Sequence, residues 1–336
     1  MGELRFGLVL GGALKDPASL ARLGRDAEAM GFDSLWSSEA WGWDAFSPLT
    51  FLAATTSTIG LGTAIAQVSA RTPAATAMAV LSAQALSGGR LRLGLGVSGP
   101  QVVEGWHGVP FTAPVDTTRE LIEVLRLALA GEKVEHHGDH FDIPWRGEGG
   151  TGQGRALRTT MAPAPATPLL VAAMGPKNVA MAVEHADGIL PYLWSPEKWS
   201  EAWGAVAHAD PGFVVAPTVF VAIGDDLAAC RDSLRGRIGF HIGGMGSKTT
   251  NFYADLVRRY GYEAEADRIQ DLFLGGQRAE AIAAVPDALV DELSLVGPVS
   301  HVREQLARWR ESPANLLILE PPSLRMLPAV AEAVYG

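Results

Sequence analysis

Short apolar runs alternate with longer stretches of apolar residues at helical spacing along most of this 336-residue chain. The short runs predict buried strands, and the longer stretches predict amphipathic helices. Eight strands follow from this pattern, at residues 6–10, 32–36, 59–65, 90–95, 169–173, 188–193, 214–223 and 316–319. Because each parallel return needs a crossover, repeated strand–helix units predict a parallel sheet. Eight such units favour an α/β fold of the closed (β/α)8, or TIM-barrel, type over an open sheet.

Two stretches interrupt this repeat. Residues 144–167 are rich in Gly, Pro, Thr and Ala and predict a long loop, whereas residues 239–297 predict a long, mostly helical insertion between strands seven and eight. Long loops inside a compact domain are often functional. No shift in composition marks a linker, so we expect residues 1–336 to form a single domain.

The segment before the long loop carries three histidines. Residues 134–143 predict a hairpin, and only His136 and His140 would point to the same face. A metal site would need a further ligand from elsewhere, so an exposed polar hairpin is the favoured interpretation and no metal is expected. Upstream, Thr117 and Glu120 have the spacing of a capping box at the start of a helix.

Composition and charge narrow the classes of function. Hydrophobic residues make up 48% of the chain and charged residues 19%, which supports a large buried core. The formal net charge of −10 argues against nucleic acid and anionic membranes as partners. The single cysteine, Cys230, cannot form an internal disulfide, and residues 1–15 lack the order of a signal peptide. We therefore expect a cytoplasmic protein.

Two glycine-rich stretches resemble nucleotide-binding motifs. Gly94–Gly99 matches the dinucleotide pattern G-x-G-x-x-G, but Pro100 follows at once, where that motif should open a long helix. Residues 243–249 resemble a phosphate-binding loop, but an extra serine breaks the Gly-Lys spacing. We interpret the second stretch as a turn and the first as weak evidence for a dinucleotide.

Candidate chemistry lies where strands end, because active sites of such barrels gather at the carboxyl ends of their strands. Glu39 follows the second predicted strand, close to Trp41 and Trp43. A lone carboxyl group beside aromatic rings would have a raised pKa and could donate or relay a proton. A helix-capping glutamate is the alternative interpretation. We take Glu39 as the candidate catalytic residue and the two tryptophans as candidates for the substrate pocket.

Two later strand ends favour cofactor binding. Glycines after the fourth strand would allow a flat ligand to approach the backbone, although they could also serve tight turns. After the fifth strand, the Gly-Pro-Lys-Asn sequence predicts a helix start, where free N–H groups and a lysine would bind phosphate. An ordinary strand-to-helix turn is the alternative. The candidate residues are Ser98, Gly99, Pro100, Gln101, Ala173, Met174, Gly175, Pro176, Lys177 and Asn178.

Several of these stretches resemble a known family. Those similar to luciferase-like monooxygenases are Gly31–Trp36, Ala54–Thr63, Arg71–Pro73, Ser87–Leu91 and Ala186–Pro191. Those similar to a narrower group, the deazaflavin-dependent oxidoreductases related to methylenetetrahydromethanopterin reductase, are Ser98–Trp106, Ala173–Asn178 and Gly243–Ser247. The resemblance extends from about residue 5 to the carboxyl terminus.

The resemblance implies a (β/α)8 barrel with an insertion near strand seven, a homodimer, and a tricyclic cofactor ring at the barrel mouth. A non-proline cis peptide, here Ala64-Ile65, would press on the ring. Glu39 would lie near the reacting edge, although Ala40 stands where some relatives have a histidine acid. The phosphate of the cofactor tail would bind at Gly175–Asn178.

Three hypotheses of function remain. The leading one is hydride transfer between the deazaflavin coenzyme F-420 and an unidentified small organic substrate, with the cofactor supplying the hydride centre. The second is an FMN-dependent luciferase-like monooxygenase, which would share the fold. The third is a non-catalytic barrel that binds a flavin or deazaflavin.

Overall fold

The computed structural model describes residues 3–11 and 15–336, so 1–2 and 12–14, part of the stretch searched for a signal peptide, lie outside the described residues. The strands of the main sheet are β1 (Arg5–Val9), β2 (Ser34–Ser37), β3 (Gly60–Thr63), β4 (Ala66–Gln67), β5 (Leu91–Gly96), β8 (Leu169–Val171), β9 (Gly188–Ile189), β10 (Val214–Val215), β11 (Thr218–Ile223), β12 (Ser294–Gly297) and β13 (Leu316–Glu320). Helices connect most of these strands, and every pairing within this sheet is parallel.

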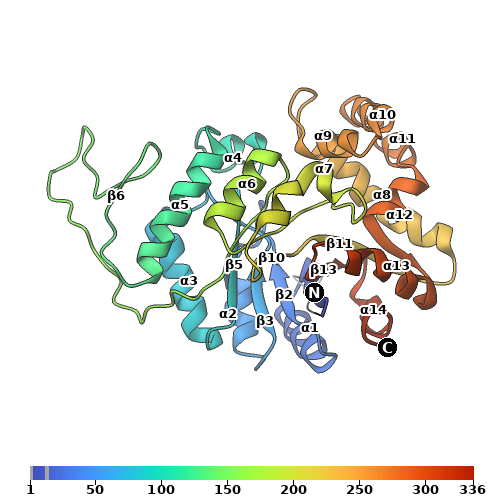
Figure 1. Cartoon of the computed structure of the whole chain (residues 1–336), viewed down its shortest axis with the longest axis horizontal. Coiled ribbons are helices and arrows are strands. Elements are labelled where there is room, and N and C mark those ends of the chain that lie inside the picture. Colours follow the sequence, from blue (N-terminus) through green and yellow to red (C-terminus); the bar gives the residue numbers. More distant parts are fainter. Residues whose placement is uncertain (1–2, 12–14) are drawn as a thin grey trace.

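Helices surround this sheet (Figure 1). They are α1 (Pro17–Ala29), α2 (Ser47–Ala53), α3 (Pro73–Ser87), α4 (Pro100–Gly105), α5 (Pro114–Leu129), α6 (Pro176–His185), α7 (Trp199–Trp203), α8 (Leu227–Gly244), α9 (Phe252–Arg259), α10 (Glu263–Leu274), α11 (Arg278–Ala283), α12 (Asp287–Leu293), α13 (Val299–Glu311) and α14 (Leu327–Tyr335).

The sheet closes on itself. Its order runs β10-β9-β8-β5-β3-β2-β1-β13-β11, and β10 and β11 are consecutive pieces of one chain segment. The expected seventh strand, 214–223, is therefore split. Pro217 stands at the break, where it has no N–H to donate, but its carbonyl accepts from the Ile318 N–H at 2.9 Å. The two ends of the sheet thus meet, which confirms the predicted closed barrel.

The inside of the barrel is filled by side chains. The buried residues that form this inner cluster are Trp36, Leu170, Leu190, Ala216, Leu316 and Ile318. A Cβ atom at Gly62 would lie 2.3 Å from the Trp36 ring, so a glycine is required for the indole to fit. Ala64 and Ile65 pack against the same cluster. The barrel is therefore a packed core rather than a channel, and ligands must bind at its ends.

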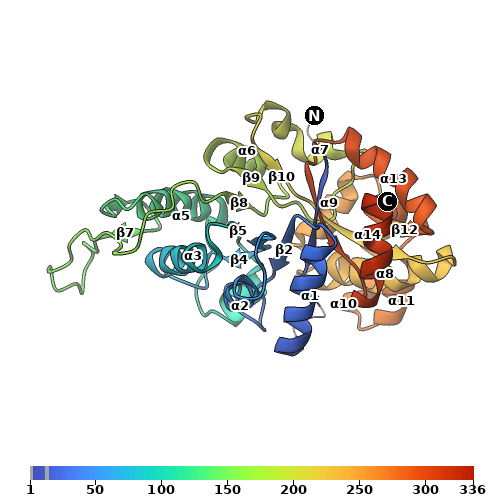
Figure 2. The ribbon, with the colours of Figure 1, turned by 90° about the horizontal axis from the view of Figure 1, so that it is seen from below.

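The two interruptions of the repeat take shape as separate features. β6 (His136–His137) and β7 (Asp142–Ile143) form the predicted hairpin, and this segment extends beyond α5 away from the body (Figures 1 and 2). Helices α8 to α12 lie between β11 and β13, so the helical stretch begins at Leu227, earlier than the expected residue 239. The same stretch also contributes β12, which pairs with the later residues of β11 and was not predicted.

The capping-box expectation is wrong. Helix α5 begins at Pro114, so Thr117 lies inside it and its hydroxyl donates to the Ala113 carbonyl at 3.1 Å. Glu120 is buried and accepts the backbone N–H groups of residues 139, 140 and 141. The carboxylate therefore fastens the hairpin to the helix instead of capping it.

No helix within residues 3–11 and 15–336 combines the length and the apolar character that a membrane span requires. The same residues contain no group of three or more His, Cys, Asp or Glu side chains that could hold a metal ion. In the hairpin, His136 Nε2 lies 3.3 Å from a carboxylate oxygen of Glu120.

Candidate active site

The segments that follow β2 and β3 lie side by side at the carboxyl end of the barrel, which we call the mouth. The Ala64 N–H donates to the Ser37 carbonyl at 2.6 Å, and the Glu39 N–H donates to the Ile65 carbonyl at 3.1 Å. The Ala64-Ile65 peptide is cis, as the resemblance implied. The structure thus brings together two site elements that the sequence placed on different strands.

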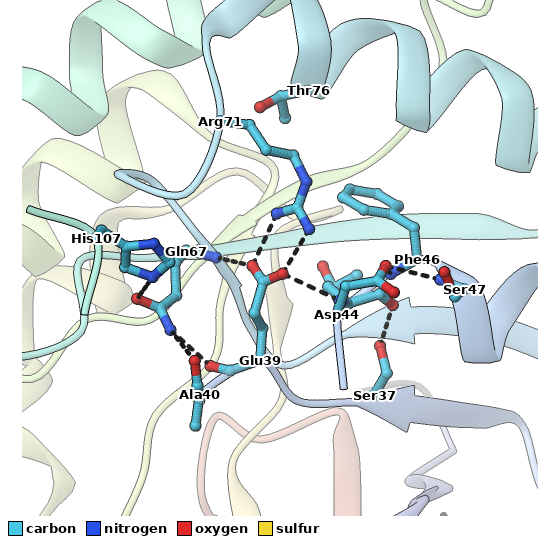
Figure 3. A network of polar contacts seen from close by, with 12 residues as sticks. Ser37, Glu39, Ala40, Asp44, Phe46, Ser47, Gln67, Arg71, Thr76 and His107 are labelled. Atoms are coloured by element: carbon cyan, nitrogen blue, oxygen red, sulfur yellow. Dashed lines mark hydrogen bonds and ion pairs between the residues drawn. The ribbon is translucent and has the colours of Figure 1, made fainter. Parts of the chain in front are cut away.

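The Glu39 carboxylate accepts hydrogen bonds from four donors (Figure 3). The Arg71 guanidinium binds it in a two-pronged pair, at 2.8 and 2.5 Å. The backbone N–H groups of Gln67 and Ala45 add bonds of 2.9 and 3.2 Å. The Glu39 side chain is only 7% exposed. Both carboxylate oxygens are therefore committed within the protein.

The expectation of a raised pKa at Glu39 is wrong. Burial by itself raises the pKa of this carboxyl group, but the bonds from Arg71 and the Gln67 N–H outweigh burial and hold the pKa below its ordinary value. Trp41 and Trp43 are 56% and 47% exposed, so these two rings are not buried beside the carboxylate. Glu39 is consequently ionised at neutral pH, and the place of the two tryptophans in a substrate pocket stays a prediction.

A second layer of contacts fixes the orientation of Gln67. Its side-chain NH2 group donates to the carbonyls of Glu39 and Ala40, at 3.1 and 3.0 Å. The side-chain oxygen must then be an acceptor, so His107, whose Nε2 lies 3.1 Å away, donates to it (Figure 3). His107 follows α4, so this chain of bonds ties α4 to the loop after β2.

The Ser98–Gln101 segment has unusual backbone geometry. Ser98 has φ of 58°, in the left-handed region, and Pro100 begins the short helix α4. Just before this segment, a Cβ atom at Gly96 would lie 2.6 Å from an Ile65 side-chain carbon, whereas one at Gly99 would meet only the side-chain oxygen of Gln101 at 3.3 Å. Packing against the cis peptide therefore explains Gly96. A cofactor contact at Ser98–Gln101 stays a prediction.

The start of α6 has the features of an anion site. Gly175 is the N-cap, with open space around a Cβ built on it, and Pro176 is the first helical residue. The Asn178 side chain does not add a donor, because its NH2 group donates to the Ala172 carbonyl and its free oxygen only accepts, so the fit rests on the backbone N–H groups. Exposed N–H groups at a helix start favour an anion, so these residues fit a phosphate.

Nothing in the local sequence points to Arg259 as part of this site. It ends α9, and its guanidinium donates to the Met174 carbonyl at 3.1 Å. A second positive charge therefore stands at Met174, directly before the start of α6 that also carries the exposed Lys177. Ala173, by contrast, is fully buried, and its carbonyl accepts from the Trp203 indole at 2.8 Å. Ala173 therefore packs in the core under the start of α6 and is not exposed to a ligand.

The sequence profile of luciferase-like monooxygenases matches residues 4–316 of this chain. The chain belongs to the luciferase-like monooxygenase family. A relative from Mycobacterium tuberculosis, whose name proposes a coenzyme F-420-dependent oxidoreductase, is 42% identical, with 98% of this chain and 99% of that protein aligned. The 5,10-methylenetetrahydromethanopterin reductase of Methanolobus tindarius is 31% identical over 84% of each chain. The resemblance inferred from the sequence is thereby confirmed.

Solved structures show the same luciferase-like fold. The coenzyme F-420-dependent tetrahydromethanopterin reductase of Methanopyrus kandleri has a TM-score of 0.78 at 22% identity, with 99% of this chain and 97% of that chain covered. An F-420-dependent secondary alcohol dehydrogenase also has a TM-score of 0.78, at 16% identity, with both chains fully covered. An FMN-bound Baeyer-Villiger monooxygenase has a TM-score of 0.63, with 99% and 97% covered. Fold likeness at this identity does not select a cofactor.

Proposed function

We propose that this luciferase-like protein is an oxidoreductase that transfers a hydride between coenzyme F-420 and a small organic substrate. The observation that carries the proposal is the 42% identity, over nearly the whole of both chains, to the mycobacterial relative named for F-420. A homodimer in the cytoplasm belongs to the same proposal, and the single, buried Cys230 suits a reducing compartment.

The residues at the mouth suit such a cofactor. When bound, F-420 would supply a two-electron hydride centre in its deazaflavin ring. The N–H groups at the start of α6, Lys177 and Arg259 would hold the phosphate of its tail. Ala64 and Ile65 would support one face of the ring, and Ser98–Gln101 would line its edge.

Glu39 has a positioning role in this proposal. Its low pKa and four donors make it a poor source of protons at neutral pH. As a fixed anion it holds Arg71 and the loops after β2 and β3 in place. Through Gln67 the same network reaches His107, so the loop after α4 is held with them.

Titration of the purified protein with F-420 and with FMN tests the proposal. Tighter binding of F-420, together with substrate-dependent oxidation of the reduced coenzyme and no oxygen uptake, is the expected result. Tight FMN binding with oxygen consumption would instead assign the protein to the monooxygenase branch. Failure to bind either cofactor at micromolar concentrations would overturn both assignments.

A further inference from the structure

Exposed apolar side chains gather on two loops at the mouth, residues 38–46 after β2 and residues 106–113 after α4. Trp106 is 65% exposed, and a Cβ atom built on Gly42, in the first loop, would meet nothing within 4 Å. The protein itself therefore leaves these side chains uncovered. The exposed apolar residues of the two loops, which we call the aromatic rim, are Trp41, Trp43, Trp106 and Val109.

Gln67 joins the two loops of the aromatic rim. Its side-chain NH2 group donates to the carbonyl of Ala40, directly before Trp41, and its side-chain oxygen accepts from His107, directly after Trp106 (Figure 3). Gln67 lies two residues beyond the cis peptide. The aromatic rim is therefore attached to the segment that we propose supports the cofactor ring.

The charges near the aromatic rim exclude one class of ligand. Glu39 and Arg71 neutralise each other in a buried pair. Asp44 accepts two backbone N–H groups at the start of α2, and Glu104 accepts a backbone N–H of the second loop at 3.2 Å. The two loops contain no lysine or arginine. An anion placed on the aromatic rim would thus meet carboxylates and no cation, which is unfavourable.

The opposite side of the mouth is polar. There the hydroxyl of Tyr192, which follows β9, donates to a carboxylate oxygen of Glu320, the last residue of β13, at 3.4 Å. Glu320 forms an ion pair with Arg237 of α8, and His241, one turn later, packs on the Tyr192 ring at a centroid distance of 4.7 Å. An apolar group placed there would take water from ionised side chains, which costs free energy.

We propose that the aromatic rim binds the apolar body of the substrate, and that the substrate is an uncharged molecule that extends from the cofactor ring to Trp106. The inference rests on the proposed function and names the class of substrate for it. Single exposed apolar side chains are common on any surface, but tryptophans on two joined loops form a patch that favours a ligand. Their rings offer a large contact area with few rotatable bonds to order.

A homologous series of methyl ketones tests the apolar contact. 2-Hexanone, 2-octanone and 2-decanone differ only in chain length. Each added methylene should tighten binding to the full-length, cofactor-free protein about twofold, which is half the free energy of full burial. In ¹⁹F spectra of protein labelled with 5-fluorotryptophan, the resonances of Trp41, Trp43 and Trp106 should shift. An affinity that does not depend on chain length, or unmoved resonances of these three residues, would overturn the inference.

A matched pair of variants locates the contact. Trp106→Ala should lower the affinity for 2-decanone about tenfold and weaken its dependence on chain length. Trp145→Ala is the control, because Trp145 is 60% exposed but follows β7 in the segment that extends away from the body. This control should bind the ketones like the wild type. Equal losses in both variants would indicate unspecific adsorption, and no loss in Trp106→Ala would exclude the aromatic rim.

Charged probes test whether the substrate is uncharged. Decanoate and decyltrimethylammonium, each below its micellar concentration, carry a similar chain with opposite charges. Measured on the Trp106 resonance, decanoate should bind at least about tenfold more weakly than 2-decanone, and the cation should bind no more tightly than the ketone. Tighter binding of either ion would contradict an uncharged substrate.

A second copy of the chain is another occupant that the aromatic rim could have. Sedimentation velocity of the double variant Trp41→Ala, Trp106→Ala distinguishes it from a substrate, because a substrate contact predicts the oligomeric state of the wild type. Dissociation of the double variant into smaller species would assign the aromatic rim to an interface between copies and overturn the inference.

The cofactor titrations described above separate the two proposals. If F-420 fails to bind while the ketones still bind at Trp106 with the expected dependence on chain length, only the proposed function is lost. If F-420 binds tightly and that dependence is absent, only the role of the aromatic rim is lost.

Discussion

Each side of the barrel mouth holds one ionisable side chain, and the two side chains have opposite protonation behaviour: one stays charged and the other is neutral. On the β2–β3 side, Glu39 keeps its charge, because Arg71 and two backbone N–H groups bind the carboxylate. On the β9–β13 side, His241 is neutral, because its burial and the nearby Arg237 charge lower its pKa to about 4 and outweigh its hydrogen bond to the Arg237 carbonyl, which favours the charged ring. Burial alone disfavours charge at both. The partners therefore decide whether a side chain becomes a fixed anion that positions loops or a neutral ring.

Removing Arg71, the partner of Glu39, should give the largest expected change, a loss of stability. Arg71→Leu leaves a carboxylate that is 7% exposed without its cation, and breaking such a pair should lower the free energy of unfolding by about 3 kcal/mol. Urea denaturation measures the loss. The double variant with Glu39→Leu should recover part of it, because neither charge then remains. A loss below about 1 kcal/mol in Arg71→Leu would show that the pair contributes little.

Neutralising Glu39 itself should affect turnover more than binding. Glu39→Gln keeps the shape but weakens the hold on Arg71, and turnover should fall ~100-fold while cofactor affinity changes little. A positioning role also predicts that the pH profile of the remaining activity keeps its wild-type inflections, because an ionised Glu39 does not titrate in that range. Steady-state kinetics from pH 6 to 9 would show both. Wild-type turnover would make Glu39 purely structural.

The start of α6 should bind the phosphate whichever side of the mouth holds the substrate. Lys177→Glu should weaken F-420 binding by more than about 1 kcal/mol, through lost attraction and added repulsion. Arg259→Glu should act in the same direction, which the sequence did not predict. Lys133→Glu, at an exposed position before the hairpin, is the control for the change in net charge. Fluorescence titration at low salt measures all three, and equal affinities would exclude this site.

The barrel was predictable because its strands are apolar runs with helices between them. The prediction failed where local sequence does not decide pairing. Pro217 splits the seventh strand through its missing N–H. Residues 294–297 become β12 only because β11 offers them an edge. The second glycine-rich stretch is a turn only from Met245 on: Gly243 lies in the last turn of α8, where a Cβ atom would lie 2.5 Å from Phe273 of α10.

The candidate site was predictable on one side only. Glu39 stood out because it directly follows a strand, and the Gly-Pro start of α6 because a helix start has its own sequence signal. Arg71 lies 32 residues from Glu39, and no local pattern reveals their pairing. His241 lies within a helix whose residues show no signal of chemistry, so its neutral state and its neighbours become visible only after folding.

The smallest expected effect is a difference in how the stability of variants on the two sides of the mouth depends on pH. His241 has a pKa of about 4 against an ordinary value of 6.5, so the unfolded chain binds its proton first and acid costs stability below pH 6.5. Between pH 7 and 5.5, the free energy of unfolding of the wild type should fall by about 1 kcal/mol more than that of His241→Phe, measured by urea denaturation.

The control is Glu39→Gln, which keeps the groups around His241, namely Tyr192, Arg237, Tyr253 and Glu320. Because the pKa of Glu39 is lowered from 4.5, its stabilising contribution is fully present above that value and is lost only in stronger acid. Glu39→Gln should therefore show the wild-type loss in this window, and an equal loss in His241→Phe would mean that His241 is not buried as a neutral ring.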